Sequence, residues 1–190
     1  MSRFVWPIHC HEKKLADIEK QRITWLQLHP APRSEEKERE YWNLFGGRIE
    51  QLLDEGSGGC LLKEKRVSQI VQDALLKFDG IRYELGSWVI MPNHVHVLVR
   101  PLGEYSLPKI LHSWKSYTAT KINRLLNRSQ PLWQKESYDH IIRSQAAQKR
   151  IEKYIDENPI KAKVEAASSR LISTNKRQDA ASTFWEPHHD

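Results

Sequence analysis

The chain has 190 residues, a formal net charge of +6 and two cysteines, Cys10 and Cys60. This length predicts one domain with extensions, large enough to bury a core without disulfides or a structural metal. No apolar run approaches the ~18 residues that a membrane span needs, and the first residues lack the apolar segment of a signal peptide. Because the cysteines are far apart and form no disulfide pattern, we expect a soluble cytoplasmic protein with no membrane partner.

Positive charge is concentrated in the second half of the chain. Residues 107–163 contain 12 Lys and Arg but 5 Asp and Glu, whereas residues 34–56 contain 7 acidic and 3 basic side chains. A basic region of this kind favours a polyanionic partner, most simply nucleic acid, and an association with the nucleoid. The alternative is an ordinary solvated basic face.

The first half of the chain predicts a strand followed by helices. Residues 1–21 show no clear period and are expected to form an N-terminal arm, whereas the β-prone run 22–28 predicts a first strand. Residues 34–56 predict an acidic helical insertion, because their apolar side chains recur at helical spacing. After the glycine-rich turn at 56–59, an apolar stripe over 67–78 predicts the first core helix.

The second half predicts the rest of a sheet and two more helices. In chain order the predicted elements are a strand over 81–91, a strand from His94, a helix over 106–126, a short strand within 138–142 and a helix over 144–158 that Pro159 ends. This order predicts an α+β fold, a ferredoxin-like sandwich with a mostly antiparallel sheet backed by helices. Residues 22–163 would form this domain, and 164–190 a flexible C-terminal tail.

Two histidines in the sequence His94-Val95-His96 are the most informative pair in the chain. Side chains alternate along a strand, so both imidazoles would leave one face of the sheet while the valines pack on the other. Two imidazoles held side by side on a rigid central strand could form half of a metal site. The alternative is an exposed strand face that carries two histidines by chance.

Tyr154 and Asn158 could complete such a site from the last helix. They lie four residues apart and therefore share one face of that helix. The amide oxygen of Asn158 is a hard metal ligand, and a phenol beside a metal-bound phosphate could act as a nucleophile in spite of its ordinary pKa of about 10. The alternatives are a packed core tyrosine and an asparagine that only ends a helix before Pro159.

Five short blocks of sequence occur in a recognisable order between about residues 42 and 163. They are G-I-R-Y at 80–83, W-V-I-M-P-N-H-V-H at 88–96, H-S-W-K-S-Y-T at 112–118, W-Q-K-E-S-Y-D at 133–139 and Y-I-D-E-N-P-I-K-A at 154–162. Together they resemble the REP-associated tyrosine transposases, relatives of the single-tyrosine HUH transposases of bacterial insertion sequences. The chain departs from the pattern of that family at residues 1–21, at Lys163 and in the tail.

The resemblance implies a role for each residue of the candidate site. His94 and His96 match the HUH metal ligands of the family. Tyr154 matches the nucleophile, and Asn158 matches the polar residue that completes the metal site. The implied activity is metal-dependent cleavage and strand transfer of single-stranded DNA at REP-type hairpins, through a 5′-phosphotyrosine intermediate. The implied cofactor is Mg²⁺ or Mn²⁺, the implied partners are DNA hairpins, and relatives occur as monomers and as homodimers.

Several other residues are weaker candidates for the site. Lys115, Arg124 and Arg143 could contact DNA phosphates, and Trp133 could stack on an unpaired base. The alternatives are solvated cations and a core tryptophan. Tyr138 is a second candidate nucleophile, but no ligand-type residue lies one helical turn away from it.

Two other functions remain open. The chain could be a DNA hairpin-binding protein whose chemistry has decayed. It could also be a zinc protein that uses the His-Cys-His run at 9–11 together with Cys60, although that spacing is not typical of a zinc finger.

Overall fold

An antiparallel sheet forms the middle layer of the computed structural model, which describes residues 1–8, 13–54, 59–134, 138–142, 145–161 and 167–168. The strands lie in the order β4-β1-β3-β2-β5, and each pair of neighbours is antiparallel. Their bounds are β1 Ser2–Pro7, β2 Tyr83–Ile90, β3 His94–Pro101, β4 Tyr138–Ile141 and β5 Ala167–Ser168. Strands β1 to β4, with the helices between them, form a ferredoxin-like sandwich, so the predicted fold class is confirmed.

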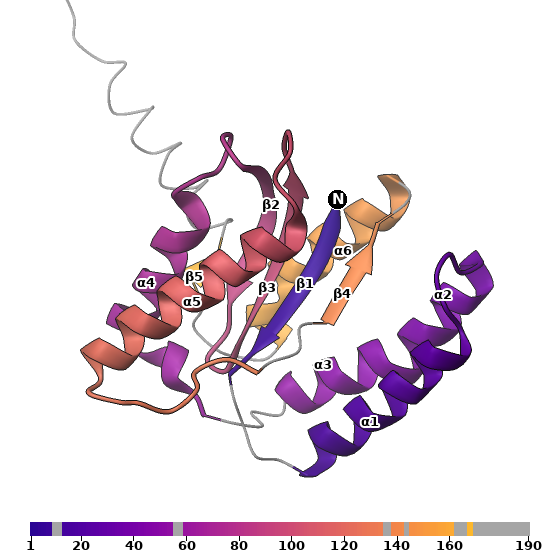
Figure 1. Ribbon diagram of the computed structural model, residues 1–190, viewed down its shortest axis with the longest axis horizontal. Coiled ribbons are helices and arrows are strands. Elements are labelled where there is room, and N and C mark those ends of the chain that lie inside the picture. The colour runs from indigo at the N-terminus through magenta and orange to yellow at the C-terminus, as the bar shows by residue number, and fades with distance from the viewer. Residues whose placement is uncertain (9–12, 55–58, 135–137, 143–144, 162–166, 169–190) are drawn as a thin grey trace, which may run out of the picture.

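Helices cover both faces of this sheet (Figure 1). Their bounds are α1 Lys13–Leu28, α2 Glu35–Tyr41, the π-helix η1 Trp42–Gly46, α3 Gly47–Asp54, the 3-10 turn η2 Leu61–Lys63, α4 Lys65–Leu76, α5 Leu107–Leu125 and α6 Gln145–Lys161. Helices α4 and α5 pack together on one face, and α6 contacts β2 and β3 on the other. Helices α1 to α3, which we call the helical insertion, lie between β1 and α4 in the chain. None of the helices in the described ranges is both long and apolar enough to span a membrane.

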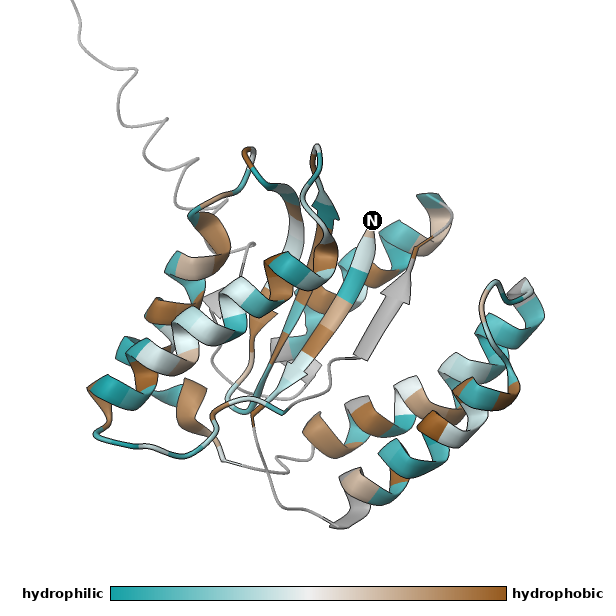
Figure 2. Ribbon diagram, viewed as in Figure 1, coloured by the Kyte–Doolittle hydropathy of each residue, from teal (hydrophilic) through white to brown (hydrophobic). Residues whose placement is uncertain are grey.

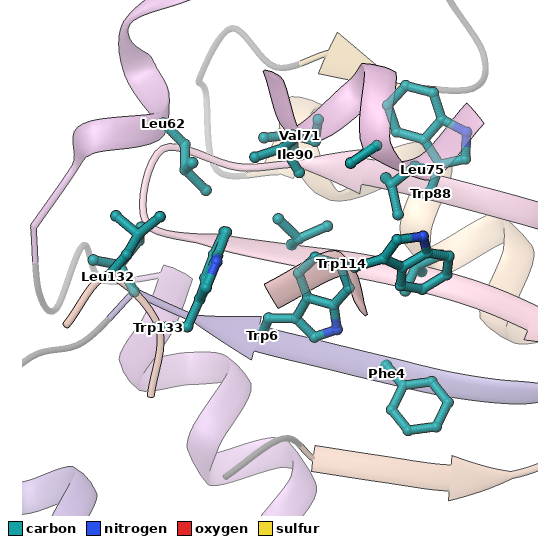
Figure 3. Packing of buried hydrophobic residues seen from close by; sticks show 14 of the residues in the cluster. Phe4, Trp6, Leu62, Val71, Leu75, Trp88, Ile90, Trp114, Leu132 and Trp133 are labelled. Atoms are coloured by element: carbon teal, nitrogen blue, oxygen red, sulfur yellow. The ribbon is translucent and has the colours of Figure 1, made fainter. Parts of the chain in front are cut away.

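Strand β3 is buried on both faces because it lies at the centre of the sheet. Val95 and Val97 belong to the core under α4 and α5. This core is rich in tryptophan (Figure 3). In that core the rings of Trp6 and Trp114 lie 5.3 Å apart. On the other face, Leu98 belongs to a second apolar cluster beneath α6. Apolar side chains therefore line the middle strands, as the hydropathy colours also show (Figure 2), and their burial holds β3 rigidly between two helical layers.

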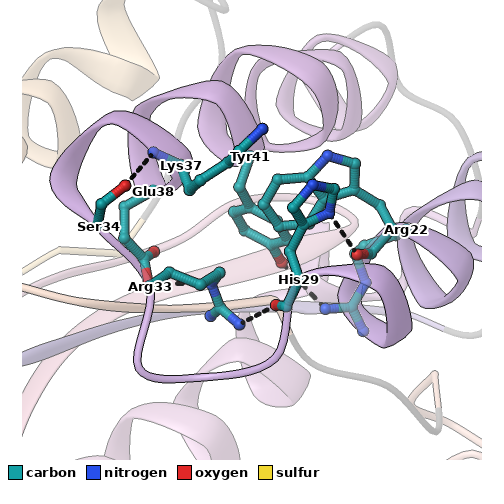
Figure 4. A network of polar contacts seen from close by, with 8 residues as sticks. Arg22, His29, Arg33, Ser34, Lys37, Glu38 and Tyr41 are labelled. Atoms are coloured by element: carbon teal, nitrogen blue, oxygen red, sulfur yellow. Dashed lines mark hydrogen bonds and ion pairs between the residues drawn. The ribbon is translucent and has the colours of Figure 1, made fainter.

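The helical insertion has a small core of its own that rests on β1. Val5 of β1 joins an apolar cluster with Trp25, Tyr41 and Phe45. The buried Arg22 donates a hydrogen bond to the Tyr41 hydroxyl at 3.0 Å, which ties α1 to α2 (Figure 4). Because Val5 lies directly opposite His96 in the antiparallel pair β1–β3, the insertion covers the face of the sheet that carries the histidines.

Local capping fixes the turn that joins α1 to α2. Ser34 lies at the N-cap of α2, where its side chain accepts a hydrogen bond from the backbone N–H of Lys37 at 3.3 Å. Arg33 donates to the His29 carbonyl at 3.2 Å and forms an ion pair with Glu38 (Figure 4). These contacts bring the two helices back against each other, so the insertion folds as a helical hairpin.

Two predicted elements at the start of the chain are wrong. The run 22–28, predicted as a strand, is the last part of α1, and residues 1–21, predicted as an arm, contribute β1 and the first half of α1. In the helix, Ile18 and Trp25 lie seven residues apart on one face and pack in the same cluster as Tyr41, so tertiary packing overrides the β propensity of the run. Strand β1 has no polar–apolar alternation to reveal it, because both of its faces are buried.

The end of α6 also differs from the prediction. The helix continues through Pro159 to Lys161, whereas the sequence predicted an end at Asn158. A proline disfavours the α conformation in the residue before it, but this is a bias that helices near their C-terminus can overcome. The helices and strands predicted between residues 34 and 142 are confirmed. Of the predicted tail 164–190, only Ala167–Ser168 lies within the described residues, and the predicted domain boundaries stay predictions.

Replacing Leu75 by Ala should destabilise the protein by about 2–5 kcal/mol, because Leu75 is fully buried between α4 and the sheet and its loss leaves a cavity. The neighbouring change Leu76→Ala is the matched control, since Leu76 is 38% exposed and should shift stability by less than about 0.5 kcal/mol. Urea unfolding monitored by tryptophan fluorescence measures both. Equal losses in the two variants would contradict the described packing of α4.

Candidate active site

The candidate site lies where β3 meets α6. His94 and His96 point to the same face of the sheet, as the alternation of side chains predicted, and both are fully buried. Tyr154 and Asn158 lie one turn apart on the face of α6 that packs on this surface, where Asn158 is buried and Tyr154 is half-buried. The structure therefore brings together all four residues that the sequence selected.

A continuous chain of polar contacts joins these four side chains. The Nε2 atoms of His94 and His96 lie 2.9 Å apart. Nδ2 of Asn158 lies 3.1 Å from Nε2 of His96 and donates a hydrogen bond to the Tyr154 hydroxyl at 3.2 Å. The phenol oxygen is thus one side chain away from the pair of imidazoles, at the edge of the apolar cluster beneath α6.

Two further residues fix the orientation of the imidazoles. Arg3 on β1 lies with Nη2 3.2 Å from Nδ1 of His96, and a guanidinium can only donate, so this nitrogen accepts. The hydrogen of the neutral ring is then on Nε2, which donates to His94, so the amide nitrogen of Asn158 lies beside Nε2 without forming a hydrogen bond to it. The other nitrogen of His94, Nδ1, lies 2.8 Å from Oδ1 of Asn93, whose Nδ2 donates to the Leu53 carbonyl at 2.7 Å. The imidazole pair is therefore held between β1 and the last residues of α3.

Both imidazoles are neutral at neutral pH. Burial, followed by the positive charge of Arg3, lowers the pKa of His94 from 6.5 to about 3. Burial also lowers the pKa of His96 well below 6.5, and the neighbouring His94 and Arg3 add to this effect. A neutral imidazole keeps a lone pair for a metal ion or a hydrogen-bond donor, so both residues are in the protonation state that ligation needs.

The donor atoms of the site fit a divalent cation. Two ligands at about 2.1 Å in neighbouring coordination positions lie roughly 3 Å apart, which matches the 2.9 Å between the two Nε2 atoms. Oδ1 of Asn158 is buried and has no hydrogen-bond partner among the described residues, and a half-turn of the amide would aim this oxygen at the histidines. Ligation through Nε2 of His96 requires Arg3 to release Nδ1, because the ring hydrogen must move there. No cluster of three His, Cys, Asp or Glu that could hold a metal occurs in the described ranges.

The phenol ring of Tyr154 is packed as well as hydrogen-bonded. Its ring lies 5.8 Å from that of His96 at an interplanar angle of 83°, an edge-to-face contact. The guanidinium carbon of Arg3 lies 4.8 Å from the centroid of the Tyr154 ring. Residues of three elements, β1, β3 and α6, therefore set the position of this side chain.

The weaker DNA-contact candidates do not join this site. Lys115 and Arg124 lie on α5, across the sheet from the histidines, and Lys115 donates to the Gln134 carbonyl at 3.1 Å. The prediction that Trp133 stacks on an unpaired base is wrong in this structure, because the ring is 7% exposed, packs against Trp6 and donates to Thr118. It is a core residue.

Some candidates fall on parts of the chain that the structure leaves undescribed. Arg143 lies outside the described residues, as do residues 9–11 of the zinc hypothesis, while Cys60 is exposed. The side chain of Tyr138, the second candidate nucleophile, is likewise undescribed, although its backbone belongs to β4. DNA contact by Lys115, Arg124 and Arg143 stays a prediction.

Sequence reasoning missed Arg3 and the supporting role of Asn93. From the sequence alone Asn93 has no assigned role, although its place directly before His94 in the P-N-H-V-H block is a signal that it belongs to the site. Arg3 carries no comparable signal, because it lies 93 residues before His96 and only the pairing of β1 with β3 brings the two together.

Comparisons with known proteins give one family and several similar solved structures. Residues 62–158, just over half of the chain, match the family described as "Transposase IS200 like". A REP-associated tyrosine transposase, solved bound to a REP hairpin, is similar at 16% identity with a TM-score of 0.48, and the match covers 84% of this chain and 66% of that one. A protein from Deinococcus radiodurans R1 described as a candidate transposase is similar at 15% identity with a TM-score of 0.37, over 83% of this chain and 88% of that one. No curated protein matches the sequence.

Replacing Asn93 by Ala should lower stability by about 1–3 kcal/mol, because the Leu53 carbonyl and Nδ1 of His94 would lose a buried hydrogen-bond partner. The change Asn43→Ala is the control, since Asn43 is an exposed residue of η1 and should have little effect. Urea unfolding of the two variants measures the difference. A loss for Asn93→Ala no greater than that for the control would show that the contact with α3 is not formed.

Proposed function

Because the chain belongs to the IS200-like transposase family, we propose that it cuts single-stranded DNA beside a hairpin and transfers the strand, with Tyr154 as the nucleophile. A role as a transposase follows from membership of the family. The substrate, the covalent intermediate and the metal are the proposal. They are supported by the motif resemblance of the sequence and by the contacts within the candidate site.

One observation carries the proposal. The Tyr154 hydroxyl is hydrogen-bonded to Asn158, whose amide lies against the His96–His94 pair. A nucleophile, a neutral pair of imidazoles and a side-chain amide therefore lie within a few ångströms of one another. A core tyrosine would instead have its hydroxyl enclosed by apolar side chains or bonded to backbone, as the buried Tyr83 is to the Leu75 carbonyl at 2.8 Å.

The proposed reaction is a transesterification in two steps. Oη of Tyr154 attacks a DNA phosphorus, the new O–P bond forms as the bond to the 3′ oxygen breaks, the phenol loses its proton and the leaving 3′ oxygen gains one. A second 3′ hydroxyl then reverses the step and receives the strand. The number of phosphoester bonds is unchanged in each step, so no external energy source is needed.

The residues of this chain would assist the first step in two ways. Nδ2 of Asn158 donates to the phenol oxygen in this arrangement, and after the half-turn that aims Oδ1 at the histidines this oxygen would accept the phenol hydrogen instead; in either case Asn158 orients the hydroxyl. The packing of Tyr154 against His96 and Arg3 limits rotation of the ring and so favours one direction of attack.

His94, His96 and Asn158 are the residues that would hold Mg²⁺ or Mn²⁺. When bound there, such a cation would polarise a phosphoryl oxygen and offset the charge that develops on the phosphate. Imidazole and amide ligands suit several divalent metals, with Mn²⁺ better matched to imidazole than Mg²⁺. We expect the partner to be a DNA hairpin with an unpaired flank, bound by a monomer or a homodimer.

The change Tyr154→Phe should abolish the covalent protein–DNA adduct, because it removes only the oxygen that attacks. The measurement is denaturing gel electrophoresis after incubation with a labelled single-stranded hairpin substrate and Mn²⁺. Tyr117→Phe is the matched control, since Tyr117 is 42% exposed on α5 and should leave adduct formation unchanged.

An adduct that persists in Tyr154→Phe would assign the nucleophile to another residue, with Tyr138 the next to test. Tight hairpin binding without any adduct in the unchanged protein, whatever the divalent metal, would instead favour the hairpin-binding protein whose chemistry has decayed.

Replacing His96 by Ala should weaken Mn²⁺ binding by at least about tenfold, because a ligand is lost. Loss of a residue that only hydrogen-bonds to a ligand already lowers metal affinity by about 10–100-fold. Electron paramagnetic resonance of free Mn²⁺ in a titration measures the affinity without DNA or turnover. His112→Ala is the control, because His112 is exposed on α5. Unchanged Mn²⁺ affinity in His96→Ala would remove this residue from the proposed ligand set.

A further inference from the structure

Arg3 lies within cation–π distance of two aromatic rings. Its guanidinium carbon is 4.8 Å from the centroid of the Tyr154 ring and 4.9 Å from that of the Trp42 ring. Arg3 itself is 2% exposed, so these contacts are shielded from water. We call these three residues the Trp42–Arg3–Tyr154 cluster. It joins the candidate nucleophile on α6 to the helical insertion through a side chain of β1.

Two members of the cluster lie outside the segment that matches the family. The match covers residues 62–158 and therefore includes Tyr154, whereas Arg3 and Trp42 precede it. The metal-ligand candidates and the candidate nucleophile belong to the matched segment, whereas Arg3, which lies over the nucleophile, and Trp42, which packs on Arg3, do not. The family match by itself therefore implies no role for the cluster.

The backbone of η1 is built around the Trp42 ring. Gly46 ends this π-helix, and a Cβ added to Gly46 would lie 2.6 Å from Cε3 of Trp42, so only glycine lets the indole lie this close. Single turns of π-helix are rare and often occur at functional sites. Phe45, in the same π-helix, is buried in the apolar cluster that includes Val5 of β1. The Trp42 ring is therefore held by Gly46 of its own helix and by Arg3 of β1.

We propose that Arg3, supported by Trp42, is a positioning residue that holds the Tyr154 ring in the orientation needed for attack on the DNA phosphorus. This rests on the proposed function, because it takes Tyr154 as the nucleophile. Asn158 contacts the phenol at its oxygen only and leaves rotation of the ring plane open, whereas a cation near the ring centroid restrains that rotation. The helical insertion is then part of the active site. This contact does not require the hydrogen bond from Arg3 to His96, so it can persist when that nitrogen is released.

The decisive comparison is between Trp42→Phe and Trp42→Leu. Both side chains are apolar and smaller than indole, but only Phe keeps an aromatic face for the guanidinium. The single-turnover rate of adduct formation at saturating hairpin DNA should fall about tenfold in Trp42→Leu and stay within about threefold of the unchanged protein in Trp42→Phe. Hairpin affinity, measured by fluorescence anisotropy without divalent metal, should be the same in both, because the cluster acts on orientation and not on binding.

A second pair of variants tests the guanidinium itself. Arg3→Lys keeps the charge but lacks the planar group that can lie over a ring, so it should also lower the rate about tenfold at unchanged hairpin affinity. Arg100→Lys is its matched control, since Arg100 is an exposed residue of β3 that pairs with Glu84. Leu44→Ala, at an exposed position of η1, controls for general disturbance of the insertion. Thermal unfolding identifies any variant that fails to fold.

Equal rates for Trp42→Phe and Trp42→Leu, or a rate for Arg3→Lys equal to that of the unchanged protein, would overturn the positioning role. A change in hairpin affinity with no change in the saturated rate would also overturn it and would make Arg3 a DNA-binding residue. The proposed function fails separately, if the unchanged protein forms no adduct or if Tyr154→Phe still forms one. The two proposals can therefore be rejected independently.

Discussion

The site depends on the burial of β3 on both of its faces. A strand at the centre of an antiparallel sheet has no backbone group left for water, and each of its side chains must find a partner in one layer or the other. In β3 the valines enter the core beneath α4 and α5, and the histidines enter the layer of α6. The same packing that stabilises the fold therefore holds two imidazoles still, 2.9 Å apart at Nε2.

Burial also decides the electrostatics of the site. Imidazoles shielded from water and placed near the positive charge of Arg3 are kept neutral, and a neutral ring can serve as a ligand or as an acceptor. Arg3 makes two contacts in the site, because it donates a hydrogen bond to His96 and lies over the ring of Tyr154. One guanidinium therefore contacts both the imidazole pair and the phenol ring.

The site is assembled from two parts of the chain, one inside the segment that matches the family and one before it. The segment 62–158, which matches the IS200-like transposases, supplies both histidines, Tyr154 and Asn158. The preceding residues supply β1 beside β3, the carbonyl of Leu53 that anchors Asn93, and the indole of Trp42. An inserted helical hairpin can serve in this way because its own small core is fixed to β1 through Val5.

The sequence by itself determined the parts that depend on local periodicity. Alternation along β3 put both histidines on one face, and a spacing of four residues put Tyr154 and Asn158 on one face of α6, so these four were predicted and are found together. The helical state of 22–28 and the strand at Ser2–Pro7 were not predicted, because packing overrides the β propensity of the first and burial of both faces leaves no alternation in the second. Only the tertiary structure brought Arg3 to Tyr154 and Trp42 to Arg3, since contacts between residues so far apart in the chain arise from strand pairing and layer packing, which leave no periodic trace in the sequence.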